Sequence, residues 1–140
     1  MDKFKEIRPV VLGIAKNNNK ILVSKGYDKV KDSTFYRCLG GGIEFYETSG
    51  EALKREFKEE IDIEIEIGEF CGVTENIFTF QGKKGHEIVF FYNIKIDDKD
   101  YKDIYPMIDD NGEDVAIWID INEFKNGKKI LYPEEILKYL

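Results

Sequence analysis

The chain is poor in the residues that bind zinc or form disulfides. Its 140 residues include one histidine, His86, and two cysteines, Cys38 and Cys71, which lie far apart and form no CxxC pair. Structural zinc sites use several cysteine and histidine ligands at short spacings, and disulfide frameworks use sets of paired cysteines. We therefore expect two reduced thiols in a cytoplasmic protein.

Long apolar runs and an excess of positive charge are also missing. No apolar stretch approaches the roughly 20 residues that span a bilayer, so no membrane association is expected. The formal net charge is −7, which argues against binding to a nucleic acid polymer through its backbone. A protein of this charge that handles phosphates needs metal ions, because both partners are anionic.

The apolar pattern predicts an α+β fold in one domain that spans residues 1–140. Residues 7–15 and 20–24 form two β-branched runs joined by asparagines, which predicts a hairpin. Period-two alternation predicts a strand at 63–67. Further strand-like runs lie at 34–39, 70–80, 86–96 and 115–121. We expect a mixed, largely antiparallel sheet with one central and one C-terminal helix.

The central helix is predicted from a capping pattern and a four-residue repeat. Thr48 and Glu51 fit a capping box. Leu53, Phe57 and Ile61 then recur on one helical face. The segment 133–140 is predicted to form the short C-terminal helix, with Pro133 near its start.

Three glutamates on the central helix suggest a metal site. Glu56, Glu59 and Glu60 fall in an arc beside the buried stripe when the sequence is placed on a helical wheel. Clustered carboxylates favour hard cations such as Mg²⁺ or Mn²⁺ over zinc. The alternative is a solvated helix face with Lys–Glu pairs, which is common for charge runs.

The glycines before this helix favour the metal site over the solvated face. Gly40, Gly41 and Gly42 permit backbone conformations closed to other residues and let the main chain approach a ligand. A plain flexible turn explains one glycine more easily than three.

With these residues in place, the sequence resembles the Nudix hydrolases, in particular small MutT-like members. The family carries a box of the form Gx5Ex7REUxEExGU, with U a bulky aliphatic residue, which corresponds here to residues 41–63. The positions that match are Gly41, Glu47, Arg55, Glu56, Glu59, Glu60 and Ile63. Phe57 replaces an aliphatic residue, and Asp62 replaces a glycine at a site that favours a left-handed backbone.

The resemblance implies an α/β/α sandwich and a metal-dependent pyrophosphohydrolase. It assigns Glu56, Glu59 and Glu60 as ligands of Mg²⁺ or Mn²⁺, with a main-chain carbonyl such as that of Gly40 as a further ligand. Arg55 and Glu47 would pair and orient the helix and its loop. The catalytic set is completed by a general base, for which the candidates are Glu59, then Glu113 or Asp114, then Glu87. A solvated acidic loop is the alternative for Glu113 and Asp114.

Substrate contacts are expected from residues around the box. Arg37 is a candidate for the diphosphate, with a salt bridge as the alternative. Gly41, Gly42, Tyr46 and Phe80 complete the predicted set. The other aromatic candidates for stacking on a base, Phe35, Tyr36, Phe45 and Phe78, are equally compatible with core positions.

The expected substrate is a nucleoside triphosphate, modified ones included, cleaved to the monophosphate and pyrophosphate. Elimination leads to this choice, since the family signatures for ADP-ribose and for NADH are missing. ADP-ribose or a nucleotide sugar remains an alternative, because such signatures are tendencies. Rivals from other classes are a non-catalytic nucleotide sensor and an isoprenoid diphosphate isomerase, whose catalytic cysteine motif is missing. Many relatives pair as dimers, so a homodimer is one expected assembly.

Overall fold

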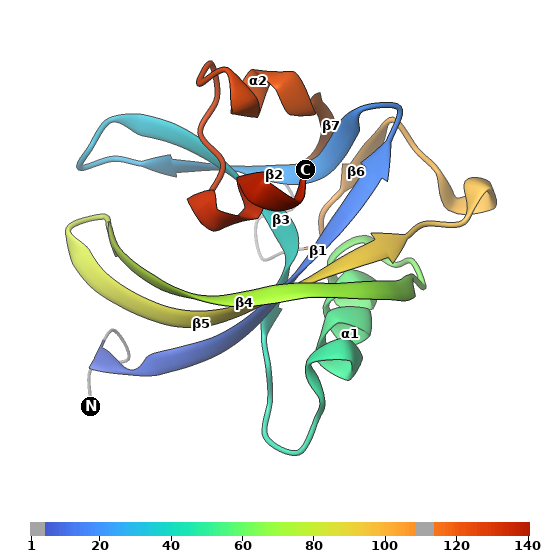
Figure 1. The fold of residues 1–140 in the computed structure, drawn as a ribbon, viewed down its shortest axis with the longest axis horizontal. Helices are drawn as coiled ribbons and strands as arrows, with labels where there is room; N and C mark the ends of the chain where they lie inside the picture. Colours follow the sequence, from blue (N-terminus) through green and yellow to red (C-terminus); the bar gives the residue numbers. More distant parts are fainter. Residues whose placement is uncertain (1–4, 109–113) are drawn as a thin grey trace.

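A seven-stranded mixed sheet forms the body of the protein (Figure 1). The computed structural model describes residues 5–108 and 114–140. The sheet order is β4-β5-β1-β3-β2-β7-β6, and the pairing of β1 with β5 is parallel while the other pairings are antiparallel. The strands are β1 (Ile7–Asn17), β2 (Lys20–Asp28), β3 (Ser33–Gly42), β4 (Glu66–Phe80), β5 (Lys83–Lys95), β6 (Ile104–Pro106) and β7 (Val115–Asp120). The predicted mixed, largely antiparallel sheet is confirmed.

Two tight hairpins follow from residues that tolerate a left-handed backbone. Asn18 and Asn19 have φ of 49° and 62° between β1 and β2, as the asparagines predicted. Gln81 and Gly82 have φ of 54° and 77° between β4 and β5. Positive φ at both central residues matches the twist of the flanking strands. The second loop is shorter than the predicted one, because Lys83 already belongs to β5.

The helix α1 (Ser49–Ile61) follows the sequence prediction closely. The Thr48 side chain accepts a hydrogen bond from the Glu51 amide, and the Glu51 side chain accepts one from the Thr48 amide. Asp62 ends the helix at φ 55° and ψ 43°, the left-handed conformation expected there. Its carboxylate pairs with Lys58 at 3.0 Å on the exposed helix end.

The sheet is covered on both faces, which gives the predicted layered sandwich (Figure 1). Leu53, Phe57 and Ile61 of α1 pack against one face of β1, β3 and β5. The helix α2 (Ile121–Lys125) and the 3₁₀ helix η3 (Glu134–Tyr139) cover the other face. The glycines of β3 lie where α1 faces the sheet, so the first layer positions the Nudix-like box.

Several short elements differ from the sequence prediction. Ile63 and Ile65 are buried as the alternation predicted, but they precede β4, which begins at Glu66. The predicted C-terminal helix is the 3₁₀ helix η3, a form typical of short pieces. The elements α2, β6 and the 3₁₀ helix η2 (Asp98–Asp100) were not predicted, since three to five residues carry no readable period. In the described ranges, no helix is long and apolar enough to cross a membrane.

Candidate active site

An arginine clamp fixes the loop before α1 to the helix. Arg55 donates to both carboxylate oxygens of Glu47, at 2.7 Å from Nη2 and 3.2 Å from Nε. The same Nη2 donates to the Gly42 carbonyl at 2.9 Å. The hydrogen bonds from Arg55 lower the pKa of Glu47, and those same contacts raise the pKa of Arg55. The predicted pairing of Arg55 and Glu47 therefore exists in the structure.

Glu56 lies directly beneath the glycine strand. A Cβ atom built on Gly41 would stand 2.5 Å from Cδ of Glu56, so a side chain at position 41 would collide with this carboxylate. Glu56 also accepts from Arg55 Nη1 at 3.0 Å. Glycine at position 41 is therefore what allows the helix carboxylate to approach the β3 backbone.

Glu59 and Glu60 flank Glu56 in different environments. The Glu59 side chain is 58% exposed and accepts from Arg55 Nη1 at 3.3 Å. Glu60 points inward, and burial followed by the neighbouring Glu56 carboxylate raises its pKa to about 8. Its Oε2 atom is enclosed and has no hydrogen-bond partner among the described residues.

These carboxylates fit a hard divalent cation by donor type and by the enclosed Glu60 oxygen. In residues 5–108 and 114–140, no group of three His, Cys, Asp or Glu side chains is gathered to hold a metal as it stands. Arg55 contacts Glu56 and Glu59 in this arrangement. A bound cation would give the Glu60 oxygen the partner it lacks, since Mg²⁺ and Mn²⁺ prefer oxygen ligands.

A cleft of about 790 Å³ opens between the β2–β3 hairpin and the β4–β5 hairpin, which project to the same side in Figure 1. Phe35 stands at the centre of an aromatic group in this cleft. Its ring lies 5.9 Å from that of Phe80, edge to face, and 5.4 Å from that of Tyr132. Most of the other residues that line the cleft are polar or charged: Arg8, Asp28, Lys31, Ser33, Arg37, Glu75, Asn76, Thr79, Glu87, Glu134 and Glu135. The apolar ones are Ile77, Phe78 and Pro133.

The outer end of the cleft is held by contacts between the two hairpin tips. The buried Asp28 carboxylate accepts from the backbone amides of Val30, Lys31 and Gln81. The Lys29 amide donates to the Gln81 side chain at 2.7 Å. Burial alone would raise the pKa of Asp28, but these amides outweigh it and the pKa is lowered. The ionised carboxylate therefore joins the two hairpins.

The inner part of the cleft contains a buried carboxylate between arginines. Glu87 accepts from Arg37 Nη2 at 2.9 Å and from Asn76 Nδ2 at 3.4 Å. Arg8 Nη1 lies 3.9 Å from its other oxygen. Arg37 lines the cleft, which is compatible with substrate binding. It also forms a salt bridge with Glu87, the alternative role considered for it. These contacts of Glu87 are with cleft residues rather than with box residues.

The other predicted residues are distributed around this centre. Tyr46 has φ 72° and is 96% exposed beside Phe45, and neither lines the cleft. Tyr36 belongs to the core against Phe124. Glu113 lies outside the described residues. Asp114 lies close to the C-terminal end of α1. Its carbonyl accepts a hydrogen bond from the Met107 amide, and the amide of the next residue, Ile108, donates to the Glu60 carbonyl.

Sequence reasoning did not identify most of the residues that line the cleft, among them Arg8, Asn76 and Tyr132. Arg8 lies in an otherwise apolar strand, and Asn76 lies in an alternating one. Tyr132 reaches the cleft because residues 130–132 run along β3, with backbone hydrogen bonds to Tyr36 at 2.8 and 2.9 Å. No local signal marks such positions, since the cleft combines segments that are distant in sequence.

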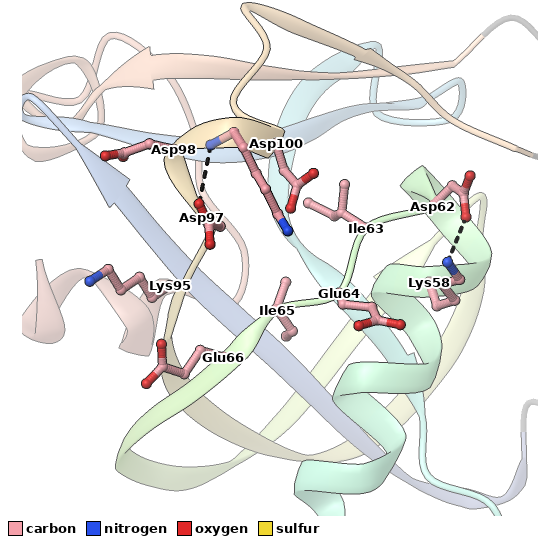
Figure 2. A pocket seen from close by; sticks show the side chains of 11 residues that line it. Lys58, Asp62, Ile63, Glu64, Ile65, Glu66, Lys95, Asp97, Asp98 and Asp100 are labelled. Atoms are coloured by element: carbon pink, nitrogen blue, oxygen red, sulfur yellow. Dashed lines mark hydrogen bonds and ion pairs between the residues drawn. The ribbon is translucent and has the colours of Figure 1, made fainter.

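A second hollow of about 580 Å³ lies at the C-terminal end of α1 (Figure 2). Its side chains are acidic in excess, with Lys58, Lys95 and Lys99 facing Asp62, Glu64, Glu66, Asp97, Asp98 and Asp100. No aromatic residue, no arginine and none of the box glutamates lines it. The hollow therefore lacks the groups that would hold a base and a phosphate, which the cleft possesses.

The box, the glycine strand and the layered sheet define a Nudix-type hydrolase. The NUDIX domain family matches residues 6–140, and the chain belongs to this family. Comparison with curated proteins gives no match.

Several solved structures resemble the chain over most of its length. The E. coli ORF135 protein is 21% identical, with a TM-score of 0.59 over 94% of this chain and 84% of that chain. The MutT protein from Bacillus halodurans is 18% identical, with a TM-score of 0.60 over 94% and 80%. The MutT protein from methicillin-resistant Staphylococcus aureus 252 is 22% identical, with a TM-score of 0.57 over 97% and 99%. At these identities the likeness shows the fold alone.

Proposed function

We propose that the chain hydrolyses a phosphoanhydride bond in a nucleoside diphosphate linked to another moiety. The leading substrate is a nucleoside triphosphate, modified ones included, with release of the monophosphate and pyrophosphate. The observation that carries the proposal is the arrangement of Glu56, Glu59 and the enclosed Glu60 beside the Gly40–Gly42 backbone. Only this part of the described structure combines oxygen donors, a close backbone approach and an unpartnered carboxylate oxygen.

Each box residue then has a role that its environment supports. Glu56, Glu59 and Glu60 would hold Mg²⁺ or Mn²⁺, with the Gly40 carbonyl as a further candidate ligand. The bound ion would neutralise the phosphates and lower the pKa of an attacking water. Arg55 and Glu47 keep the loop and helix in register through their paired hydrogen bonds. Glu59 is our first choice of general base, since its exposed carboxylate can reach a water molecule.

The cleft supplies the other half of the site. Phe35, Phe80 and Tyr132 offer ring faces for a nucleobase, and stacking on such rings is largely independent of the base. Arg37 lies deeper in the cleft and its guanidinium suits a phosphate oxygen. The nucleoside would therefore lie between the hairpins while the phosphates extend toward the glycine strand.

Turnover of a panel of nucleotides tests this proposal. Nucleoside triphosphates, ADP-ribose, dinucleoside polyphosphates and nucleotide sugars are each incubated with Mg²⁺ or Mn²⁺, and every product is identified. Glu59→Gln is run beside the wild type. Glu64→Gln is the matched control, because Glu64 is an exposed glutamate four residues after Glu60 and lines the acidic hollow instead.

The expected result is metal-dependent release of a nucleoside monophosphate that is lost in Glu59→Gln and kept in Glu64→Gln. If ADP-ribose or a nucleotide sugar is the preferred substrate, the proposed triphosphate substrate is wrong but the proposed reaction class stands. Tight binding of a nucleotide without turnover of any compound would overturn the proposal in favour of a sensor.

A further inference from the structure

Arg8 lies where the cleft meets the glycine strand. It is the second residue of β1 and lies in register with Glu87 of the parallel neighbour β5. A Cβ atom built on Gly42 would stand 3.4 Å from Nη2 of Arg8, so the guanidinium lies close to the β3 backbone. The next residue along β3 is Gly41, which meets Glu56. Arg8 therefore lies on the cleft side of the sheet, across the glycine backbone from Glu56 on the α1 side.

The three arginines of the chain differ in how firmly they are held. Arg55 is engaged by Glu47, Glu56 and the Gly42 carbonyl. Arg37 is 27% exposed and donates directly to Glu87 at 2.9 Å. Arg8 is 56% exposed, and its ion pair within the described residues is a long one, 3.9 Å to Glu87. Its N–H donors are thus oriented toward the cleft without a close partner there.

The charge immediately around Glu87 is positive, although the cleft as a whole is acidic because Asp28, Glu75, Glu134 and Glu135 also line it. One buried carboxylate faces two guanidinium groups, so the trio has an excess of one positive charge. Glu87 is 6% exposed at its side chain, and Asn76 also donates to it, so it cannot turn away to neutralise Arg8 further. A planar guanidinium with available N–H groups matches two phosphate oxygens at once.

We propose that Arg8 binds the phosphate group that is attached to the nucleoside. This inference rests on the proposed function and adds a binding residue that is outside the box. The ligand is a phosphate monoester or the nucleoside-linked phosphate of a diphosphate, held at the inner end of the cleft while the base lies among the aromatic rings.

The test compares a phosphorylated and an unphosphorylated ligand of the same base. Adenosine and AMP, and guanosine and GMP, are titrated into the metal-free protein in the presence of a chelator, with nuclear magnetic resonance shifts or calorimetry as readout. Arg8→Gln removes the charge at an exposed position, and Glu87 keeps its close contact with Arg37. Lys25→Gln is the matched control, since Lys25 is an exposed cation on β2 that does not line the cleft.

Arg8→Gln is expected to weaken binding of the monophosphate about 10-fold, the effect of losing charge-assisted hydrogen bonds, while nucleoside binding stays unchanged. Arg8→Lys keeps the charge but not the planar fork, and is expected to fall between wild type and Arg8→Gln. Lys25→Gln is expected to bind both ligands as the wild type does.

Equal binding of the monophosphate by Arg8→Gln and Lys25→Gln would overturn the inference, as would an equal loss for nucleoside and monophosphate. The outcome is separate from that of the proposed function. If the wild type turns over nucleotides and Arg8→Gln binds the monophosphate normally, the role of Arg8 is refuted and the proposed hydrolase activity stands. If monophosphate binding depends on Arg8 but no compound is turned over, the role of Arg8 stands and the proposed hydrolase activity is refuted.

Discussion

The two halves of the site are built in different ways. The box half is local: Glu47, Arg55, Glu56, Glu59 and Glu60 come from one loop and one helix. Arg55 donates hydrogen bonds of 2.7–3.3 Å to Glu47, Glu56 and Glu59. The cleft half is assembled from β1, β3, β4, β5 and residues 132–135, and its centre is aromatic.

The difference indicates a division of labour. The box half is rich in carboxylates and has an enclosed oxygen without a partner, as expected for a site of chemistry completed by a cation. The cleft half has rings and arginines, which suit recognition of a base and a phosphate. Changes in the box should therefore act mainly on kcat, and changes in the cleft mainly on KM.

The largest expected effect is that of Glu59→Gln. Loss of a general base should lower kcat by about 10²–10⁴-fold, and at saturating Mg²⁺ the change in KM should be the smaller of the two. Steady-state kinetics with saturating Mg²⁺ measures both parameters. A large rise in KM at constant kcat would place Glu59 in binding and break the proposed division.

Gly41→Ala should reduce kcat/KM by about 10²-fold, because its methyl group would displace the Glu56 carboxylate from the glycine strand. Gly50→Ala is the control, since a Cβ atom there meets nothing within 4 Å. The activities of the two alanine variants are compared in one assay. Similar activity in both would contradict the close contact between Glu56 and β3.

Phe35→Leu should raise KM for the preferred nucleotide about 10-fold, since the ring face for stacking is lost while apolar volume is kept. Phe45→Ala serves as comparison, because Phe45 is nearly fully exposed and does not line the cleft. Thermal melts establish that both variants are folded. If Phe45→Ala raised KM and Phe35→Leu did not, the base would bind at the loop before α1 instead.

The last expected effect concerns stability rather than turnover. Burial raises the folded pKa of Glu60 to about 8 from a usual 4.5, so its contribution to stability is present below pH 4.5 and is lost as pH rises to 8. Glu60→Gln removes this dependence, and at the upper end of the range it should raise the free energy of unfolding of the metal-free protein by about 1–3 kcal/mol.

Urea unfolding across this pH range, with a chelator present, gives the comparison for Glu60. Adding Mg²⁺ at the upper end should stabilise the wild type more than Glu60→Gln, because the charged carboxylate would then be a ligand. Equal pH slopes for the two proteins would contradict the enclosed position of Glu60.

The box half could be predicted from sequence because its contacts are local. Thr48, Glu51 and Asp62 specify both ends of α1, and helical spacing places the glutamates relative to the buried stripe. The glycines were expected to form a loop, but they continue β3, with Gly41 in register with Val11. That pairing depends on a distant strand, so the sequence at the glycines does not reveal it.

The cleft could be predicted only in part. Arg37 and Phe80 were candidates because arginine and aromatic residues suit nucleotides, and both line the cleft. Tyr46 was a candidate through its place in the box and lies outside the cleft. Arg8 and Tyr132 were missed, since their neighbours Glu87 and Phe35 are far away in the chain. The order of strands in the sheet decides which residues Arg8 and Tyr132 contact, and sequence periodicity does not predict that order.

The most direct test of the account is nucleotide binding to variants that cannot turn over. Equilibrium binding of the preferred nucleotide with Mg²⁺ is measured for Glu59→Gln alone and for Glu59→Gln combined with Phe35→Leu. We predict that the single variant still binds the nucleotide, and that the double variant binds it about 10-fold more weakly than the single variant does. Equal affinity of the two variants would contradict the central claim that the cleft holds the nucleoside while the box carboxylates act on its phosphates.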